Sequence, residues 1–335
     1  MPNITHPTAW LVVPCYNEEQ ALPKTAPVFL QKWKDLISQH KISENSRIVF
    51  VDDGSKDRTR EIIENYHQEH SLIDGIFLSR NRGHQNAVLA GLLSSIPYCD
   101  CCISIDADLQ DDIHAIDKMI DSYVNGAEVV YGVRSKRETD TWFKRFTAES
   151  FYKLMQGMGA NIIFNHADYR LLSRRALEEL AKFPEVNLFL RGMVPLLGYS
   201  SEVVEYERNE RVAGESKYPL KKMLSFAFEG ITSLSVTPIR WITRLGISIF
   251  CISLLILLYS LVRHLQGSTV IGWTSLIVSI WAIGGLILLS IGVVGEYVGK
   301  TYLETKRRPR YLIETFLHHP ADEEKAGNLD ETAEV

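Results

Sequence analysis

Short apolar runs alternate with longer amphipathic stretches over the first 135 residues. Five runs have the length and the β-branched or aromatic content of buried strands: Ala9–Val13, Arg47–Val51, Ile73–Leu78, Cys101–Ile105 and Glu128–Val133. The four stretches between them are long enough for helices: Glu18–Gln39, Asp57–His70, Gly83–Ile96 and Asp112–Asn125. This alternation predicts an α/β domain with a mostly parallel sheet that helices cover on both faces.

Polar clusters follow four of these expected strands. They span Pro14–Glu19, Asp52–Lys56, Ser79–Gly83 and Asp106–Asp112. Ligands of open α/β sheets bind at the carboxyl ends of the strands. The pattern therefore predicts a binding site along that edge of the sheet.

The pattern is less regular between residues 136 and 235. Within this stretch, Trp142–Met155 is expected to form an amphipathic helix. Pro219–Ser235 carries apolar residues on one side and lysines nearby, which favours a helix lying in a membrane interface. An ordinary helix that faces a protein core is the alternative.

Two uncharged stretches near the C-terminus, Leu245–Val262 and Leu265–Gly295, are each long enough to cross a bilayer as a helix. They predict a transmembrane hairpin of two helices. The turn between them holds Arg263, whereas several lysines and arginines lie on both outer flanks. Because positive residues favour the cytoplasm, we expect a multi-pass protein of the inner (cytoplasmic) membrane whose catalytic domain faces the cytoplasm. Glycines in the second stretch suit packing against the first helix or against a second subunit of a homo-oligomer: Gly284, Gly285, Gly292 and Gly295.

These patterns divide the chain into four parts. They are a cytoplasmic catalytic domain (1–218), a juxtamembrane amphipathic helix (219–241), two transmembrane helices (242–296) and a cytoplasmic C-terminal segment with its tail (297–335). The formal net charge of −5 over 335 residues argues against a general nucleic-acid binder. Among the five cysteines, Cys99, Cys101 and Cys102 lack the spacing of a zinc site. We expect the cysteines to be reduced and these three to pack as small apolar side chains.

Asp106 and Asp108 flank a single alanine where the fourth expected strand closes. Two carboxylates at that place favour a hard divalent cation, Mg²⁺ or Mn²⁺, and Gln110 would supply a third oxygen. Such a cation would bridge a diphosphate and neutralise the charge on a departing nucleotide. The alternative is a helix cap or an ordinary loop, since an isolated Asp-x-Asp is common.

The remaining polar clusters each allow two interpretations. Asp52 or Asp53 would accept hydrogen bonds from a base or a ribose, while Ser55 or Asp57 would cap the following helix, and both can hold. Arg80–Gly83 offers arginine side chains and backbone N–H groups to a phosphate, or else is a solvated basic loop.

Taken in order, the motifs resemble those of family 2 glycosyltransferases. They are most similar to the polyprenyl-phosphate group, which includes dolichol-phosphate mannosyltransferases and bactoprenol glucosyltransferases. The resemblance covers about residues 8–315 and rests on Pro14–Glu19, Asp52–Asp57, Arg80–His84, Asp106–Asp111, Tyr131–Arg134, Ala167–Leu172, Gly214–Tyr218, Gly295–Lys300 and Arg307–Tyr311.

The resemblance implies a Rossmann-like GT-A fold and a role for each matching residue. The catalytic residues would be Asp106, Asp108, Arg134 and Asp168. The divalent metal, Mg²⁺ or Mn²⁺, would be held by Asp106, Asp108 and Gln110. The nucleotide sugar and the phosphate groups would contact Pro14, Tyr16, Glu18, Asp52, Asp53, Arg211, Ser216 and Lys217.

The reaction expected from this resemblance is the inverting transfer of one sugar from a nucleotide sugar, UDP-glucose by default, to a polyprenyl (undecaprenyl) phosphate. A sugar hydroxyl would need a general base when it attacks. A phosphate monoester has its second pKa at about 6 and is already mostly dianionic at neutral pH. The acceptor can therefore attack in one displacement without a strong base.

Two other functions are weighed against this one. A processive polysaccharide synthase would need more spans, and Thr237–Trp241 lacks the glutamine of the Gln-x-x-Arg-Trp motif of such enzymes. A membrane-bound nucleotide-sugar binder without turnover is disfavoured by the acidic motifs at the strand ends. The sequence departs from the family in one place, since Asp112-Ile113-His114 replaces the prolines that usually follow Asp111.

Overall fold

The computed structural model describes residues 5–134, 166–207, 239, 241–249, 252, 255 and 273–319. These residues fall into two compact units. The first unit holds the described residues up to 207 together with 308–319, and the second holds those from 239 to 307. The helices expected at Trp142–Met155 and Pro219–Ser235 lie outside the described residues.

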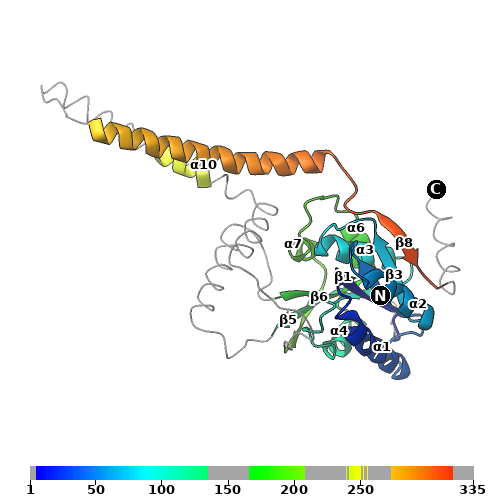
Figure 1. The fold of residues 1–335 in the computed structure, drawn as a ribbon. Helices are drawn as coiled ribbons and strands as arrows, with labels where there is room; N and C mark the ends of the chain where they lie inside the picture. The colour runs from blue at the N-terminus through cyan, green and yellow to red at the C-terminus, as the bar shows by residue number, and fades with distance from the viewer. Residues whose placement is uncertain are drawn as a thin grey trace, which may run out of the picture. The chain divides into compact units, whose positions relative to one another are not determined.

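An eight-stranded sheet forms the centre of the first unit, in the order β7-β5-β6-β4-β1-β2-β3-β8 (Figure 1). The strands are β1 (Ala9–Cys15), β2 (Arg47–Asp52), β3 (Ile73–Leu78), β4 (Cys101–Ser104), β5 (Val129–Arg134), β6 (His166–Ser173), β7 (Ser201–Tyr206) and β8 (Ile313–Leu317). β6 is antiparallel to both of its neighbours, and β8 is antiparallel to β3. All other strands point the same way, so the mostly parallel α/β fold expected from the sequence is confirmed.

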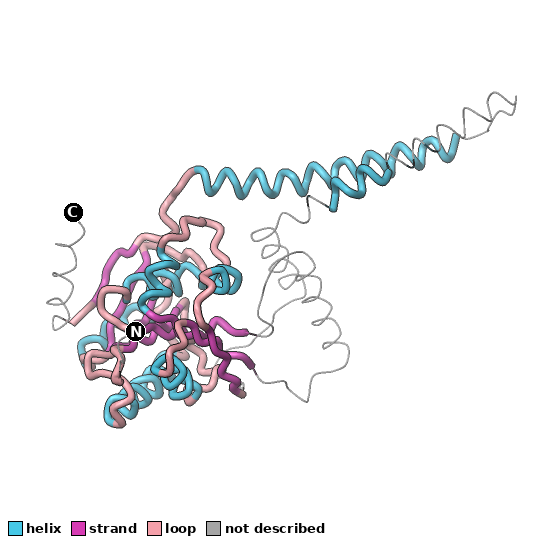
Figure 2. The backbone as a smooth tube through the Cα atoms, turned by 180° about the vertical axis from the view of Figure 1, so that it is seen from behind, coloured by secondary structure: helices cyan, strands magenta, loops and turns pink. Residues whose placement is uncertain are grey.

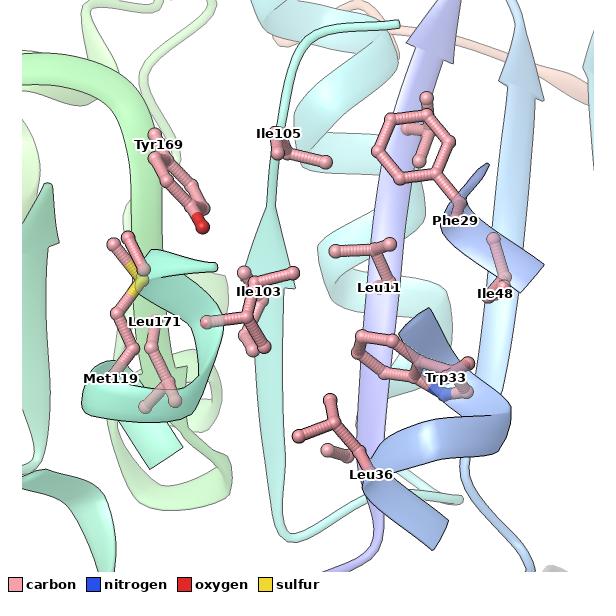
Figure 3. Packing of buried hydrophobic residues seen from close by; sticks show 14 of the residues in the cluster. Leu11, Phe29, Trp33, Leu36, Ile48, Ile103, Ile105, Met119, Tyr169 and Leu171 are labelled. Atoms are coloured by element: carbon pink, nitrogen blue, oxygen red, sulfur yellow. The ribbon is translucent and has the colours of Figure 1, made fainter. Parts of the chain in front are cut away.

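Helices cover both faces of this sheet (Figure 2). They are α1 (Leu22–Ser38), α2 (Thr59–Glu69), α3 (His84–Ser95), α4 (Ala115–Val124), α6 (Arg174–Ala181) and α7 (Leu190–Leu196). Alternate residues of a strand point to opposite faces, and β1 shows the consequence. Leu11 packs with Phe29 and Trp33 of α1 (Figure 3), whereas Trp10 and Val12 belong to the core under α3, α6 and α7.

The five strands predicted from the apolar runs are all present, with ends that differ by at most two residues. The first helix begins later than expected, at Leu22 instead of Glu18. The cause is a contact with the segment that follows β2. The N–H groups of Glu18 and Glu19 donate to Thr59 Oγ1 and Asp57 Oδ2, at 2.8 Å and 3.1 Å, and these residues stay outside the helix. The four cysteines that the structure describes are buried and unbridged, as expected: Cys15, Cys99, Cys101 and Cys102.

The C-terminal helix differs from its prediction in where it ends. α10 (Trp273–Thr305) continues ten residues past Gly295, where the second membrane span was expected to stop. Glu296 and Lys300 lie one turn apart, 4.0 Å from each other, so the charged positions share one face and do not interrupt the helix. Within α10, Ile283–Thr305 is long and apolar enough to cross a membrane.

The other half of the expected hairpin is described only in part. Residues 241–249 are helical, and most of the stretch between them and α10 lies outside the described residues. The structure therefore shows one candidate membrane-spanning helix in its described part, and the two-helix hairpin stays a prediction.

Candidate active site

The register of β4 and β6 brings two of the predicted residues together at the carboxyl edge of the sheet. Ser104 pairs with Arg170 in this antiparallel ladder. Continuing the register by two residues places Asp106, just after β4, opposite Asp168 near the start of β6. The hydroxyl of Ser104 also donates to the backbone carbonyl of Asp168, at 2.6 Å, which fixes the two chain segments against each other.

His84 lies between these two carboxylates. It is the first residue of α3, and its Nε2 is 3.5 Å from Asp106 Oδ1 and 3.8 Å from Asp168 Oδ2. The side chain of His84 is 44% exposed and that of Asp106 is 39% exposed, so a ligand can reach both from solvent. Burial raises the pKa of Asp53, and His84 is one of the groups that oppose this increase, so His84 acts on carboxyl groups at the ends of both β2 and β4.

The pKa of the Asp106 carboxyl group lies close to neutral pH. The recessed position of this group among protein atoms raises its pKa, His84 works in the opposite direction, and the neighbouring Asp111, Asp168 and Asp108 add to the increase, so that the pKa is about 6. A group with these neighbours gains from any bound cation that compensates the crowded negative charge.

Asp168 has the opposite environment. Its Oδ1 accepts hydrogen bonds from Arg170 Nη2 at 2.6 Å and from Arg191 Nε at 3.1 Å, and its Oδ2 accepts one from Arg191 Nη2 at 3.0 Å. Burial opposes ionisation of this carboxyl, but Arg191 and Arg170 outweigh burial and hold the pKa of Asp168 well below its usual range. Asp168 is therefore a fixed anion whose position two arginines determine.

The loop after β4 presents the second carboxylate of the Asp-x-Asp pair. Leu109 adopts a left-handed backbone conformation, with φ of 52°, and this turns the chain back so that Gln110 N–H donates to Asp108 Oδ1 at 3.1 Å. Asp106 and Asp108 supply only carboxylate oxygens, which is the donor chemistry that Mg²⁺ and Mn²⁺ prefer. In addition to burial, Asp111, Asp168 and Asp108 each raise the pKa of Asp106, so a divalent cation held there would offset their negative charge.

Arg134 is held at the same edge by a buried carboxylate. At the end of β5, its Nε and Nη2 donate to Asp111 Oδ1 at 3.3 Å and 3.1 Å. Tyr206, at the end of β7, donates its hydroxyl to the same oxygen at 2.6 Å. Because Arg134 remains 26% exposed, its guanidinium can serve a phosphate while Asp111 and Tyr206 orient it.

Asp53 connects the loops that follow β2 and β3 through hydrogen bonds. Its Oδ1 and Oδ2 accept hydrogen bonds from the N–H groups of Arg82 and Gly83, at 2.6 Å and 2.8 Å, and the residue is 2% exposed. The N–H groups that the sequence suggested for phosphate binding are thus used by Asp53 in this structure. Asp52 is equally buried and accepts from Ser55 N–H at 3.2 Å.

Gly54 explains why the loops after β2 and β3 approach so closely. Its φ is +65°, a conformation that side chains rarely adopt. A Cβ at this position would lie 2.6 Å from the backbone carbonyl carbon of Arg80 and 2.6 Å from the backbone nitrogen of Asn81. Only glycine leaves room for the contact that positions Asp53 and the start of α3.

The predicted nucleoside residues lie where β1 and β2 end. Pro14 is in β1 beside Val51, and Tyr16 follows β1 with 42% of its surface exposed. Asn17 connects the two loops, because its N–H donates to Ser55 Oγ and its Oδ1 accepts from Lys56 N–H, both at 2.9 Å. A base stacked on the exposed ring of Tyr16 would therefore meet a rigid platform.

The structure brings most of the predicted residues to one edge and adds several to which the sequence assigned no role. Arg211, Ser216 and Lys217 lie outside the described residues. The added residues hold or neighbour the predicted ones: His84, Asp111, Arg170, Arg191 and Tyr206. For His84, Asp111 and Arg170 a signal existed, since they lie in the family motifs Arg80–His84, Asp106–Asp111 and Ala167–Leu172, whereas Arg191 sits in the stretch without a clear pattern.

Several known proteins resemble the chain over most of its length. Residues 10–181 match the family model described as Glycosyl transferase family 2. The chain is 51% identical over 315 residues to the uncharacterized glycosyltransferase YkoT of Bacillus subtilis (strain 168), covering 94% of each protein. It is 42% identical over 310 residues to the bactoprenol glucosyl transferase of Shigella phage SfX, covering 91% of this chain and 98% of that protein.

A solved structure with a similar chain course is the mannosyltransferase PcManGT from Pyrobaculum calidifontis in complex with GDP-Man and Mn²⁺. It is 15% identical, with a TM-score of 0.43 over 90% of this chain and 86% of that one. The family match and the whole-length relatives settle the class of protein: the chain belongs to glycosyl transferase family 2 and is a glycosyltransferase.

Proposed function

We propose that this chain transfers a single sugar from a nucleotide sugar to a polyprenyl phosphate, with inversion at the anomeric carbon. The observation that carries the proposal is the match to a bactoprenol glucosyl transferase over 91% of this chain. A match of that extent covers the sheet and continues into the apolar C-terminal helix, so it is not limited to the catalytic motifs. A lipid acceptor stays in the membrane, which explains why one chain contains both the catalytic sheet and the apolar C-terminal helix.

A divalent cation, Mg²⁺ or Mn²⁺, would be held by Asp106 and Asp108, with Gln110 as a third ligand. When bound, it would neutralise charge on the diphosphate of the donor. The protein's own contribution is to keep the loop after β4 in place through the left-handed turn at Leu109. Asp168, fixed by its two arginines, would stand beside the sugar and hold it for in-line attack.

The arginines and the histidine at this edge would receive the acceptor. Its phosphate is already anionic at neutral pH, so the site needs no strong base and must instead overcome repulsion between two anions. Arg134, oriented by Asp111, is placed for this task, and His84 offers a further donor between Asp106 and Asp168. Arg211, Ser216 and Lys217 would add contacts to phosphate groups, as the family resemblance implies.

The donor nucleotide would bind at the ends of β1 and β2, with its base on Tyr16 and polar contacts from Asp52. Pro14 and Glu18 would complete this part of the site, while Asp53 acts mainly by holding the loop after β3. UDP-glucose is the donor proposed by default, since the relatives that name a sugar name glucose.

The membrane part of the proposal rests on the apolar helix. α10 would cross the inner membrane together with a second span formed around residues 245–262, and the catalytic domain would face the cytoplasm, where nucleotide sugars are made. Glycines along α10 would allow packing against the other span or against a second copy of the chain.

The direct test is to incubate the purified protein with undecaprenyl phosphate, Mg²⁺ or Mn²⁺, and a panel of UDP- and GDP-sugars, and to analyse the lipid by mass spectrometry. One hexose per lipid phosphate is expected, with inverted configuration by NMR of the anomeric proton. Absence of glycolipid with every donor would overturn the proposal. Products that carry several sugars would favour a processive synthase, and donor binding without nucleotide release would favour a binder.

A further inference from the structure

A cluster of histidines and one aspartate lies at the edge of the sheet opposite to the candidate active site. Asp74 is the second residue of β3, at the amino end of a strand whose carboxyl end faces the active site. His67 is in the last turn of α2, and His318 and His319 directly follow β8. Because β8 is antiparallel to β3, its C-terminal end meets the start of β3, and these four side chains come together.

Asp74 is the charged centre of this cluster and is fully buried. Its Oδ2 accepts a hydrogen bond from His318 Nδ1 at 2.9 Å. Its Oδ1 has no hydrogen-bond partner among the described residues, and His67 Nδ1 lies 3.7 Å away from it. A buried carboxylate oxygen without a partner carries a large desolvation cost, so this atom points to a ligand that would compensate it.

The hydrogen bonds of His67 and His319 define which ring nitrogens carry protons. His67 Nδ1 is 2.7 Å from the backbone carbonyl of Ile73, and His319 Nε2 is 3.2 Å from the backbone carbonyl of His67. A carbonyl oxygen only accepts, so each of these two nitrogens must donate. In the neutral ring the second nitrogen then carries a lone pair, and the backbone carbonyl holds the ring in a fixed orientation, as for metal-binding histidines.

The imidazole rings of His67 and His319 stack on each other. Their centroids are 4.1 Å apart, with 30° between the ring planes. The stacking keeps both rings beside Asp74. His67, Asp74 and His319 can each offer one ligand atom such that all three atoms lie within 4.8 Å of one another.

We propose that His67, Asp74 and His319 bind a divalent transition-metal ion such as Zn²⁺, and that His318 positions the carboxylate of Asp74. Two imidazole nitrogens and one carboxylate oxygen form a ligand set typical of zinc, with the fourth position left to water. Mg²⁺ prefers oxygen ligands, so this site differs in chemistry from the Asp106–Asp108 loop. Ligands of a tetrahedral ion with bonds of about 2.1 Å lie roughly 3.4 Å apart, so binding draws the three side chains slightly closer.

The ion would fasten the C-terminal strand to the catalytic sheet. One ligand comes from α2, one from β3 and one from the residue two positions after β8. β8 is an edge strand of five residues, and within the described part of the chain it pairs only with β3. A metal that joins its end to two other elements would stop this short strand from detaching.

Metal binding by the full-length protein, purified in detergent and freed of metal, tests the proposal. Zn²⁺ is titrated by calorimetry in the presence of excess Mg²⁺, and Co²⁺ is added separately to record the visible absorption of a four-coordinate ion. We expect one Zn²⁺ per chain, with affinity at least about 100-fold weaker in His67→Ala and in His319→Ala. Unchanged affinity in both variants would overturn the proposal, as would a Co²⁺ spectrum without four-coordinate bands.

Two control variants separate this site from other metal-binding positions. His70→Ala removes a histidine at the end of the same helix that stacks on Tyr66, outside the cluster, and should leave Zn²⁺ binding intact. Asp108→Asn removes a ligand of the proposed active-site metal and should also bind one Zn²⁺ as the wild type does. Loss of binding in Asp108→Asn alone would assign the ion to the active site and overturn the proposal.

Hydrogen exchange of the wild-type protein provides a second measurement that does not depend on the folding of a variant. Zn²⁺ should slow the exchange of amides in β8 and raise the Tm, without slowing exchange in the loop after β4. Equal exchange of β8 with and without Zn²⁺ would contradict the proposed fastening of this strand.

Discussion

Asp106 lies opposite Asp168 across the β4–β6 pair, yet the two carboxyl groups ionise very differently. The pKa of Asp106 is raised to about 6, whereas that of Asp168 is held below its usual range. Burial raises the pKa of Asp106 and the neighbouring carboxylates add to that increase, whereas Arg191 and Arg170 both donate to Asp168 and outweigh its burial. One member of the pair is therefore a permanent anion, and the other changes charge close to the pH of the cell.

This difference predicts how metal binding at the Asp106–Asp108 loop depends on pH. The pKa of Asp106 is raised to about 6, so above pH 6 the carboxylate is ionised and available as a ligand, and below pH 6 protons compete with the metal. We expect Mn²⁺ affinity to be constant above pH 7 and to fall by up to about tenfold for each unit below pH 6. Calorimetric titration between pH 5 and pH 8 measures it, and equal affinity at both ends would contradict the assignment.

His84 should set the midpoint of that titration. It lowers the pKa of Asp106, with its Nε2 3.5 Å from Asp106 Oδ1. His84→Gln keeps a polar side chain but removes the imidazole ring that lowers the pKa of Asp106, so the pH midpoint for Mn²⁺ binding should move upward. His114→Gln, an exposed histidine just before α4, is the matched control and should leave the midpoint unchanged. A midpoint that stays the same in both variants would show that His84 does not act on Asp106.

Asp108→Asn should remove most transferase activity. The amide keeps the size of the side chain but loses the charge that a divalent cation needs, so kcat/KM should fall at least about 100-fold, with a higher metal requirement. Asp112→Asn lies in the same loop and is the control, because the Asp112 side chain accepts a hydrogen bond from His114 N–H and lies outside the proposed ligand set. Similar activity of the two variants would refute the metal role of Asp108.

The strands and the edge that binds ligands were predictable because they depend on local pattern. β1 to β5 are mostly apolar runs, as expected for strands buried on both faces, with Asp74 of β3 as an exception, and each is followed by polar residues within a few positions. The placement of Asp106 and Asp108 after β4 follows from the same rule. The position of α1 was predicted less well, since Glu18 and Glu19 are helix formers by composition but bond to the neighbouring loop.

The rest depended on contacts between residues that are distant in the sequence. β6 enters the sheet between β4 and β5, and nothing near Asp168 indicates that it will face Asp106. Arg191 reaches Asp168 from a short helix 23 residues further along the chain. β8 is recruited to the sheet after a long apolar helix, so no local pattern distinguishes it from an isolated C-terminal strand. Long-range pairing of this kind is decided by the whole fold.

Arg191→Lys should weaken the hydrogen bonding to Asp168 without unfolding the protein. Lysine keeps the positive charge but loses the two-pronged geometry in which Nε and Nη2 donate to Oδ1 and Oδ2. We expect kcat to fall about tenfold, with little change in the KM for the nucleotide sugar. Arg175→Lys is a suitable control, because Arg175 is 61% exposed, pairs with Glu128 and lies over Tyr199, outside the proposed catalytic residues. Equal kcat values for the two variants would show that Asp168 takes no part in catalysis.

Gly54→Ala should destabilise the protein more than the same change at Gly198. The two glycines have nearly equal φ values, +65° and +68°, so alanine meets the same backbone strain of about 1 kcal/mol at both positions. At Gly198 a Cβ has nothing within 4 Å, whereas at Gly54 it would lie 2.6 Å from backbone atoms of Arg80 and Asn81. Because backbone atoms cannot swing aside, we expect Gly54→Ala to lose roughly 1–3 kcal/mol more than Gly198→Ala in the free energy of unfolding.

The same comparison reports on the active site. Pushing the loop after β3 away from Gly54 would lengthen the hydrogen bonds from Arg82 and Gly83 to Asp53, and would displace His84 at the start of α3. Gly54→Ala should therefore lower kcat even at temperatures where it is fully folded, while Gly198→Ala should lower only the Tm. Thermal unfolding followed by circular dichroism, together with kcat measured well below both transitions, separates the two effects. If both variants lost stability equally and kept full kcat, the close approach at Gly54 would have no part in positioning His84.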